Sequence, residues 1–194
     1  FTLLNPFLAD YIQERVSKGL IVLDLLRPIG FLQQMFAGQI GATTGVLPFI
    51  LAALPFAAVL GSLRPPSSLA ALGFYLLSLV LAYLLTALLS LLLGMIAFWT
   101  IEMSGFRMIY YFTSKFFAGA FIPLALFPEP LRIVAGILPF QALASLPFSI
   151  YLGQLQGPAL AQALLTQLAW VLTLGLLAFF IWRLALRRVI IQGG

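Results

Sequence analysis

The sequence contains neither cysteine nor histidine, and only 8% of its 194 residues are charged. The absence of cysteine excludes disulfides, a thiolate nucleophile and a cysteine metal site. The absence of histidine removes the commonest metal ligand and the usual proton carrier near neutral pH. No Walker sequence and no Gly-x-Ser-x-Gly motif is present, so neither ATP hydrolysis nor an intramembrane serine hydrolase is indicated. We therefore expect no catalytic residues, no metal site and no cofactor bound by the chain itself.

Apolar residues are what the sequence has in excess. Hydrophobic residues make up 63% of the chain, the mean hydropathy is +1.13, and the formal net charge is only +5. Several uncharged runs exceed the roughly 18–20 residues that cross the hydrocarbon core of a bilayer as a helix. The sequence thus predicts an all-α membrane protein, a polytopic helical bundle forming a single transmembrane domain over residues 1–194. The small net charge gives no reason to expect a nucleic-acid partner.

Four apolar runs are expected to cross the membrane, namely residues 36–63, 69–101, 108–127 and 158–182. The first is closed by Arg64-Pro-Pro-Ser-Ser68, a strong turn signal. The second is longer than a bilayer is thick at about 1.5 Å per residue, so it must tilt, bend near Gly94 or protrude. The stretch from Phe1 to Leu8 has the composition of the end of an earlier span, and residues 183–194 form a tail.

The segment from Leu131 to Leu152 allows two interpretations. Pro139 and Pro147 divide it into pieces too short to cross alone. It is either a pair of short re-entrant or interfacial helices within residues 129–153, or one proline-kinked span. Charge placement favours the short pair, because the basic residues then gather on one side, which marks the cytoplasm. That side receives Arg15, Lys18, Arg27, Arg107, Arg183, Arg187 and Arg188, and the other receives Arg64 and Arg132. Both chain ends are then cytoplasmic and residues 129–153 extracytoplasmic.

Residues 10–28 carry six of the fifteen formal charges and have helical periodicity. Asp10 is expected to act as an N-cap, with Gln13 completing a capping box. Glu14 and Lys18 form an i,i+4 ion pair in the favourable order. An apolar stripe is predicted at Ile12, Val16, Leu20 and Leu23.

Two breaks divide this charged segment. Gly19 is expected to end or bend the first helix, and Pro28 to stop a second short one spanning residues 20–26. The pattern fits an interfacial helix lying on lipid with solvated charges. It fits equally well a docking helix that transmits motion from a cytosolic partner.

The run Tyr11-Ile-Gln-Glu-Arg-Val-Ser-Lys-Gly-Leu-Ile-Val-Leu-Asp-Leu-Leu-Arg-Pro-Ile29 resembles the cytoplasmic loop of bacterial ABC-2 type permeases, the branch called ABC-2 family transporter proteins. Its Leu-Leu-Arg-Pro element is the most specific part of the likeness. Three further stretches agree with the resemblance, namely Gly119–Pro128, Leu138–Leu143 and Arg187–Gly194. Such permeases have six spans, so the resemblance implies that this sequence lacks the first two.

The resemblance implies a membrane-spanning permease subunit of an ATP-binding-cassette exporter in the bacterial inner membrane. Its expected partners are two ATP-binding-cassette ATPase subunits, which would bind ATP and Mg²⁺, a second permease subunit in a homo- or heterodimer, and membrane lipid. The residues expected to contact the ATPase are Glu14, Arg15, Lys18, Asp24 and Arg27. Asp24 and Arg27 are three residues apart, so a purely structural salt bridge is an equally good interpretation of that pair.

A polar and aromatic cluster early in the third predicted span is a candidate lining of the transport pathway. Its members are Tyr110, Tyr111, Thr113 and Ser114. The alternative function is an ion-coupled secondary carrier or another helical membrane protein, but coupling to an ion needs a titratable group in the path. Glu102 is the only acidic residue near a span interior, and it is expected at the interface.

Overall fold

The computed structural model describes residues 7–61, 68–100 and 102–192, and all regular structure within them is helical. The α-helices are α1 (Phe7–Ser17), α2 (Ile21–Leu25), α3 (Phe31–Gly61), α4 (Leu69–Met95), α5 (Ser104–Phe117), α6 (Glu129–Ile137), α7 (Ser145–Tyr151) and α8 (Gly157–Gln192). Short 3₁₀ helices are η2 (Ile96–Phe98), η3 (Leu124–Leu126) and η4 (Pro139–Leu143). This arrangement confirms the predicted all-α class.

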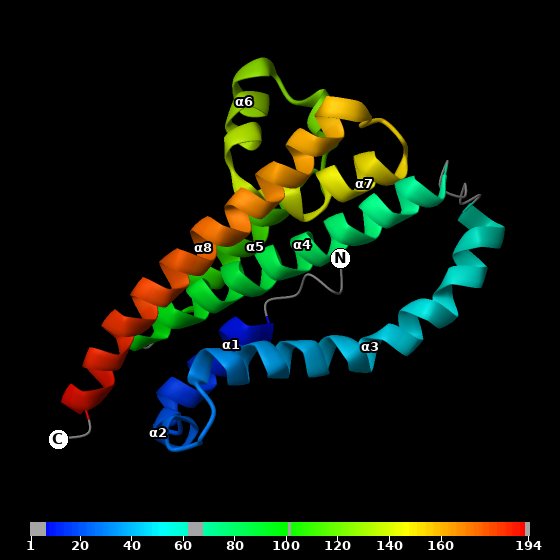
Figure 1. Cartoon of the computed structure of the whole chain (residues 1–194). Helices are drawn as coiled ribbons and strands as arrows, with labels where there is room; N and C mark the ends of the chain where they lie inside the picture. The colour runs from blue at the N-terminus through cyan, green and yellow to red at the C-terminus, as the bar shows by residue number, and fades with distance from the viewer. Residues whose placement is uncertain (1–6, 62–67, 101, 193–194) are drawn as a thin grey trace.

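Helix α4 is the centre of the bundle. It packs along α8, and α1, α7 and η4 also lie against it (Figure 1). Leu85 and Leu91 of α4 are 0% exposed and belong to one buried cluster with Leu174 of α8. The buried side-chain amide of Gln167 links α8 to α4 and η4. It accepts a hydrogen bond from the Ser78 hydroxyl of α4 at 2.9 Å and donates one to the Ala142 carbonyl of η4 at 2.8 Å.

Three helices are long and apolar enough to cross a membrane among the described residues, and they cover Phe31–Ala53, Leu69–Phe98 and Gly157–Arg188. Helix α3 begins five residues before the predicted span 36–63, and α8 continues through most of the predicted tail. Much of α3 is exposed, including Phe49 and Phe56, so its apolar surface is suited to lipid. Residues 1–6 and residues 62–67, which include Arg64, lie outside the described ranges.

The structure differs from the predicted span 108–127. Helix α5 has only 14 residues, a length of about 21 Å at roughly 1.5 Å per residue, which is short of the roughly 30 Å hydrocarbon core. The helix ends in a Schellman motif. Gly119 has φ +78°, its N–H donates to the Phe116 carbonyl, and the Ala120 N–H donates to the Lys115 carbonyl. The apolar composition of the run hid this local stop signal.

Residues 129–153 form two separate short helices, α6 and α7, connected by η4. With nine and seven residues, neither is long enough to cross a bilayer. Both lie at the end of the bundle where α8 begins (Figure 1). The side of the membrane that they face remains a prediction.

Candidate functional site

Helix α1 packs closely on the C-terminal end of α4. Ala9 and Ile12 are 0% exposed, and Gly94 of α4 makes their approach possible. A Cβ atom at Gly94 would lie 2.9 Å from the Ile12 Cδ1 atom and 3.0 Å from the Ala9 Cα atom. The Ala9 N–H donates to the Ser90 hydroxyl at 3.1 Å, which satisfies one of the free donors of the first helical turn. Helix α1 is therefore held on α4 by direct packing and by a hydrogen bond.

An ion pair joins α1 to α2. The Arg15 guanidinium donates two hydrogen bonds to the Asp24 carboxylate, from Nε to Oδ2 at 2.6 Å and from Nη2 to Oδ1 at 2.5 Å. The Asp24 side chain is 0% exposed, whereas that of Arg15 is 18% exposed. The hydrogen bond to Asp24 raises the pKa of Arg15. A bidentate pair of this kind fixes the orientation of α2 relative to α1 as well as holding the two helices together.

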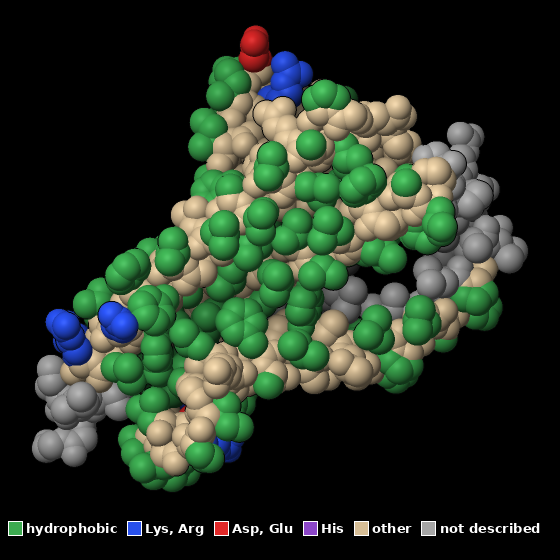
Figure 2. Space-filling model, in the orientation of Figure 1, with side chains coloured by type: hydrophobic (Ala, Val, Ile, Leu, Met, Phe, Trp, Pro, Cys, Tyr) green, Lys and Arg blue, Asp and Glu red, His purple; other side chains and the backbone are tan. Residues whose placement is uncertain are grey.

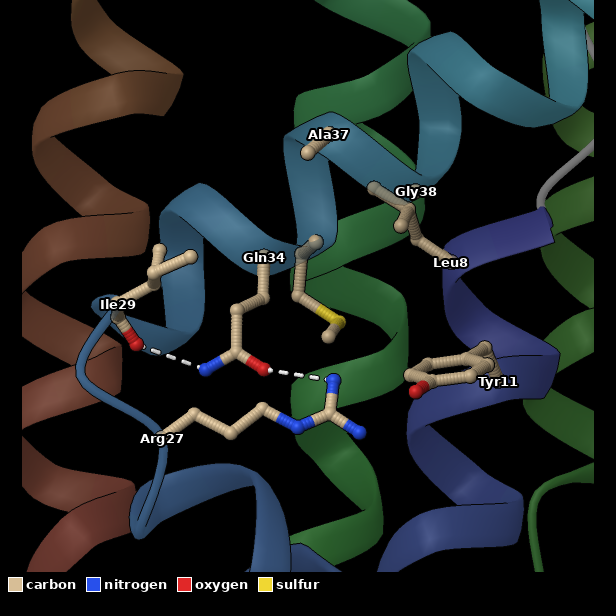
Figure 3. Close-up of a pocket in the computed structure, with 8 residues that line it drawn as sticks. Leu8, Tyr11, Arg27, Ile29, Gln34, Ala37 and Gly38 are labelled. Atoms are coloured by element: carbon tan, nitrogen blue, oxygen red, sulfur yellow. Dashed lines mark hydrogen bonds between the residues drawn. The ribbon is translucent and has the colours of Figure 1, made fainter.

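The Gln34 amide joins the loop after α2 to the first turn of α3. Its Nε2 donates to the Asp24 carbonyl at 2.8 Å. The same Nε2 donates to the Ile29 carbonyl at 2.8 Å, and Oε1 accepts from Arg27 at 3.3 Å (Figure 3). The distance between Arg27 Nη2 and Asp24 Oδ1 is 3.6 Å, so the predicted pairing of Arg27 with Asp24 is secondary to that of Arg15. We call α1, α2 and residues 26–38 the elbow.

The five residues predicted to meet an ATPase divide into two groups. Glu14 and Lys18 form their expected ion pair at 2.6 Å with side chains 58% and 60% exposed, and the hydrogen bond from Lys18 lowers the pKa of Glu14. Arg27 is 55% exposed. Arg15 and Asp24 are instead paired with each other inside the elbow, whereas the structural salt bridge predicted from the sequence was that of Asp24 with Arg27.

The predicted apolar stripe is only partly correct. Ile12 is buried as expected, but Leu23 is 55% exposed, because the bend at Gly19 (φ +68°) turns α2 away from the face of α1. Leu23 belongs to an exposed apolar patch on α2 and the following residue, together with Val22 and Leu26. The sequence prediction continued the helical periodicity of α1 past Gly19, and it therefore did not identify this exposed patch.

The predicted N-cap at Asp10 is wrong, because α1 already begins at Phe7. Asp10 lies in the first turn of α1 and pairs with Arg107 of α5, with 2.5 Å between Oδ1 and Nη1. This contact links the elbow to α5.

Glu102 is exposed in the loop before α5, where its carboxylate accepts a hydrogen bond from the Ser104 N–H at 2.7 Å. That bond lowers the pKa of Glu102.

The four candidate pathway residues do not share one face of α5. Tyr110 packs toward Phe140 of η4, with 6.5 Å between the ring centroids, and Ser114 is buried. Tyr111 is 41% exposed, while Thr113 is half-buried. Their role in a pathway stays a prediction.

Among the residues that the structure describes, no group of three acidic side chains could hold a metal ion.

The basic residues predicted for one side are carried by the elbow, the start of α5 and the end of α8. These elements lie at one end of the bundle, and Figure 2 shows basic side chains there beside α2 and on α8. The opposite end carries α6 with Glu129 and Arg132. The surface between the two ends is largely hydrophobic (Figure 2).

A family model described as "ABC-2 family transporter protein" matches residues 3–193, almost the whole chain. A search of curated proteins and a search of solved structures found no match.

Proposed function

We propose, because the chain belongs to the ABC-2 family of transporter proteins, that its elbow couples a transport pathway to a separate ATP-binding-cassette ATPase. The family match supports a permease component of an ABC transporter, which is a membrane transport component. ATP and Mg²⁺ would bind to the ATPase subunit, since the sequence has no Walker motif.

The observation that carries the proposal is that α1 is attached to three other parts of the bundle. Close packing at Gly94 attaches it to α4, and the Asp10–Arg107 ion pair attaches it to α5. The Arg15–Asp24 ion pair attaches it to α2. A displacement of α2 by a partner is therefore passed to two helices of the bundle. An interfacial helix lying on lipid has no need of these attachments.

The surface that would meet the ATPase is the exposed side of α2 and the end of α1. Val22, Leu23 and Leu26 are 49%, 55% and 77% exposed, and the Glu14–Lys18 pair lies beside them on the chain. An apolar centre with charged groups at its edge is the usual composition of a protein interface. We assign the apolar residues the anchoring role and the charged pair a part in orientation.

The orientation in the membrane follows from the distribution of basic residues. The elbow end carries seven lysines and arginines among the described residues, so we place it in the cytoplasm of a bacterium. Helices α6 and α7 would then lie at the outer surface and close the exit. We propose export, with a pathway formed between this chain and a second permease subunit, and of the four α5 candidates Tyr111 is the best exposed to line it.

Site-specific cross-linking tests the coupling surface. The sequence has no cysteine, so Leu26→Cys is unique within it and can carry a photoactivatable cross-linker in the assembled transporter. We expect a cross-link to the ATPase subunit. Ile137→Cys is the matched control, because Ile137 is 68% exposed and belongs to α6, a helix at the opposite end of the bundle. Equal cross-linking from both positions, or none from Leu26→Cys, would contradict the proposal.

A further inference from the structure

A pocket of about 360 Å³ lies between α1, the loop after α2 and the first turns of α3 (Figure 3). It is lined by Leu8, Tyr11, Arg27, Ile29, Gln34, Met35, Ala37 and Gly38. The volume is in the range of pockets that hold small molecules. Its walls are mostly apolar, and its polar groups gather on one side, where the guanidinium of Arg27 points toward Gln34 and Tyr11 (Figure 3).

The polar side of the pocket has an excess of positive charge. Asp24 already receives two hydrogen bonds from Arg15, so one carboxylate faces two guanidinium groups. Arg27 has a long 3.3 Å hydrogen bond to a neutral amide and lies 3.6 Å from Asp24, beyond hydrogen-bond distance. Its side chain is 55% exposed. A guanidinium with free donors at a pocket rim is well suited to a phosphate, which it can bind through two parallel hydrogen bonds.

The level of the pocket matches the headgroup region of a bilayer. The apolar span of α3 begins at Phe31, whose ring stacks on Trp182 of α8 with 4.2 Å between the centroids. Tryptophans followed by a basic residue, here Arg183, are typical of the interface between lipid and water. Arg27 comes before Phe31 in the chain and so lies on the water side of this interface. Gly38 lies about 10 Å beyond Phe31 along α3, at roughly 1.5 Å per residue, and so lies on the hydrocarbon side.

We propose that this pocket binds the phosphate of an anionic phospholipid from the adjacent leaflet. Arg27 holds the phosphate, and the start of an acyl chain lies against Leu8, Met35 and Gly38. The apolar walls favour a lipid over free phosphate, because an inorganic ion offers them nothing to contact. Space is available beside Gly38, where an added Cβ atom would meet no atom within 4 Å. Under this proposal Arg27, one of the five residues predicted to contact the ATPase, contacts a lipid instead.

Photolabelling of the whole transporter, full-length permease with its ATPase subunits, tests this site. The complex is reconstituted in phosphatidylcholine vesicles that contain a small fraction of photoactivatable phosphatidylglycerol, and labelled peptides are mapped by mass spectrometry. We expect labelling within residues 7–38. Arg27→Gln should lower it about fivefold, the effect of one basic residue on binding at an anionic surface. Arg132→Gln on α6 is the control at the opposite end and should leave this labelling unchanged.

Gly38→Leu provides a second test because it fills the pocket and keeps every charge. It should lower labelling of residues 7–38 to a similar extent as Arg27→Gln. Equal labelling by photoactivatable phosphatidylcholine, or full labelling of the Gly38→Leu variant, would overturn the site. Displacement of the label by inorganic phosphate would show a free-phosphate site and overturn the lipid assignment. No step requires ATP turnover, so failure of the proposed coupling leaves this result unaffected.

Discussion

Replacing Gly94 by alanine should separate α1 from α4. The added Cβ atom would lie 2.9 Å from the Ile12 side chain and 3.0 Å from the Ala9 Cα atom. The Ile12 end can rotate, but Ala9 Cα is backbone and cannot. Restoring ordinary contact at about 3.4 Å or more therefore requires α1 to move by roughly 0.5 Å, which also strains the hydrogen bond from Ala9 to Ser90.

The free-energy cost combines two opposing effects. Overpacking a tight contact costs about 1–3 kcal/mol, while alanine in a helix interior is favoured over glycine by about 0.5–1 kcal/mol. The net destabilisation lies between about 0 and 2.5 kcal/mol, with a midpoint of about 1.3 kcal/mol. For a chain of this size each kcal/mol shifts the melting temperature by about 2–4 °C, so at the midpoint of this range we expect a decrease of about 3–5 °C.

The assay is the thermal unfolding midpoint of the purified complex in detergent. Gly73→Ala is the matched control, because Gly73 lies on the same helix but an added Cβ atom there would meet nothing within 4 Å. It should leave the midpoint unchanged or raise it. A Gly94→Ala variant as stable as the Gly73→Ala variant would refute the argument that close packing holds the elbow on α4.

Three further predictions concern buried polar contacts and pH. Arg15→Gln should destabilise the elbow more than the double variant Arg15→Gln/Asp24→Asn, because the single change leaves a carboxylate buried without its main partner; limited proteolysis between α1 and α3 measures this. Gln167→Leu should lower the melting midpoint by about 2–4 °C, as two interhelical hydrogen bonds in a membrane contribute about 1 kcal/mol together, and an unchanged midpoint would refute it. The lowered pKa of Glu14 means that its pair with Lys18 stabilises the folded state above the ordinary carboxylate pKa of 4.5 and that this stabilisation is lost as the pH falls through the lowered value. The cross-link yield at Leu26→Cys should therefore be steady above pH 4.5 and fall at lower pH, and Glu14→Gln should reduce that fall; an equal fall in both variants would contradict the role of the pair.

Local backbone chemistry made part of the elbow predictable. The stops at Gly19 and Pro28 and the Glu14–Lys18 pair follow from neighbours within a few residues, and the structure confirms them. The end of α5 at Gly119 follows from equally local chemistry, but the surrounding apolar run hid it.

Contacts between distant parts of the chain were not predictable in this way. The N–H of Ala9 finds its partner 81 residues away at Ser90, and Asp10 finds Arg107 at a separation of 97 residues. A carboxylate near the start of a helix predicts an N-cap when its neighbours alone are considered. Periodicity placed Leu23 on a buried face for a related reason: the bend at Gly19 turns α2 away from the face of α1, and the Arg15–Asp24 pair joins the two helices across that bend.

The most direct test of the account follows ATP-driven movement from the elbow to α5. An environment-sensitive fluorophore on Tyr111→Cys, which is exposed on α5, reports the change that ATP and Mg²⁺ cause in the assembled transporter. With the native elbow we expect a change in emission on ATP addition. In the Gly94→Ala and Asp24→Asn backgrounds the ATPase should remain bound, as cross-linking at Leu26 would verify in parallel samples, but the emission change should be lost. An undiminished change in both backgrounds would contradict the claim that the elbow relays the movement.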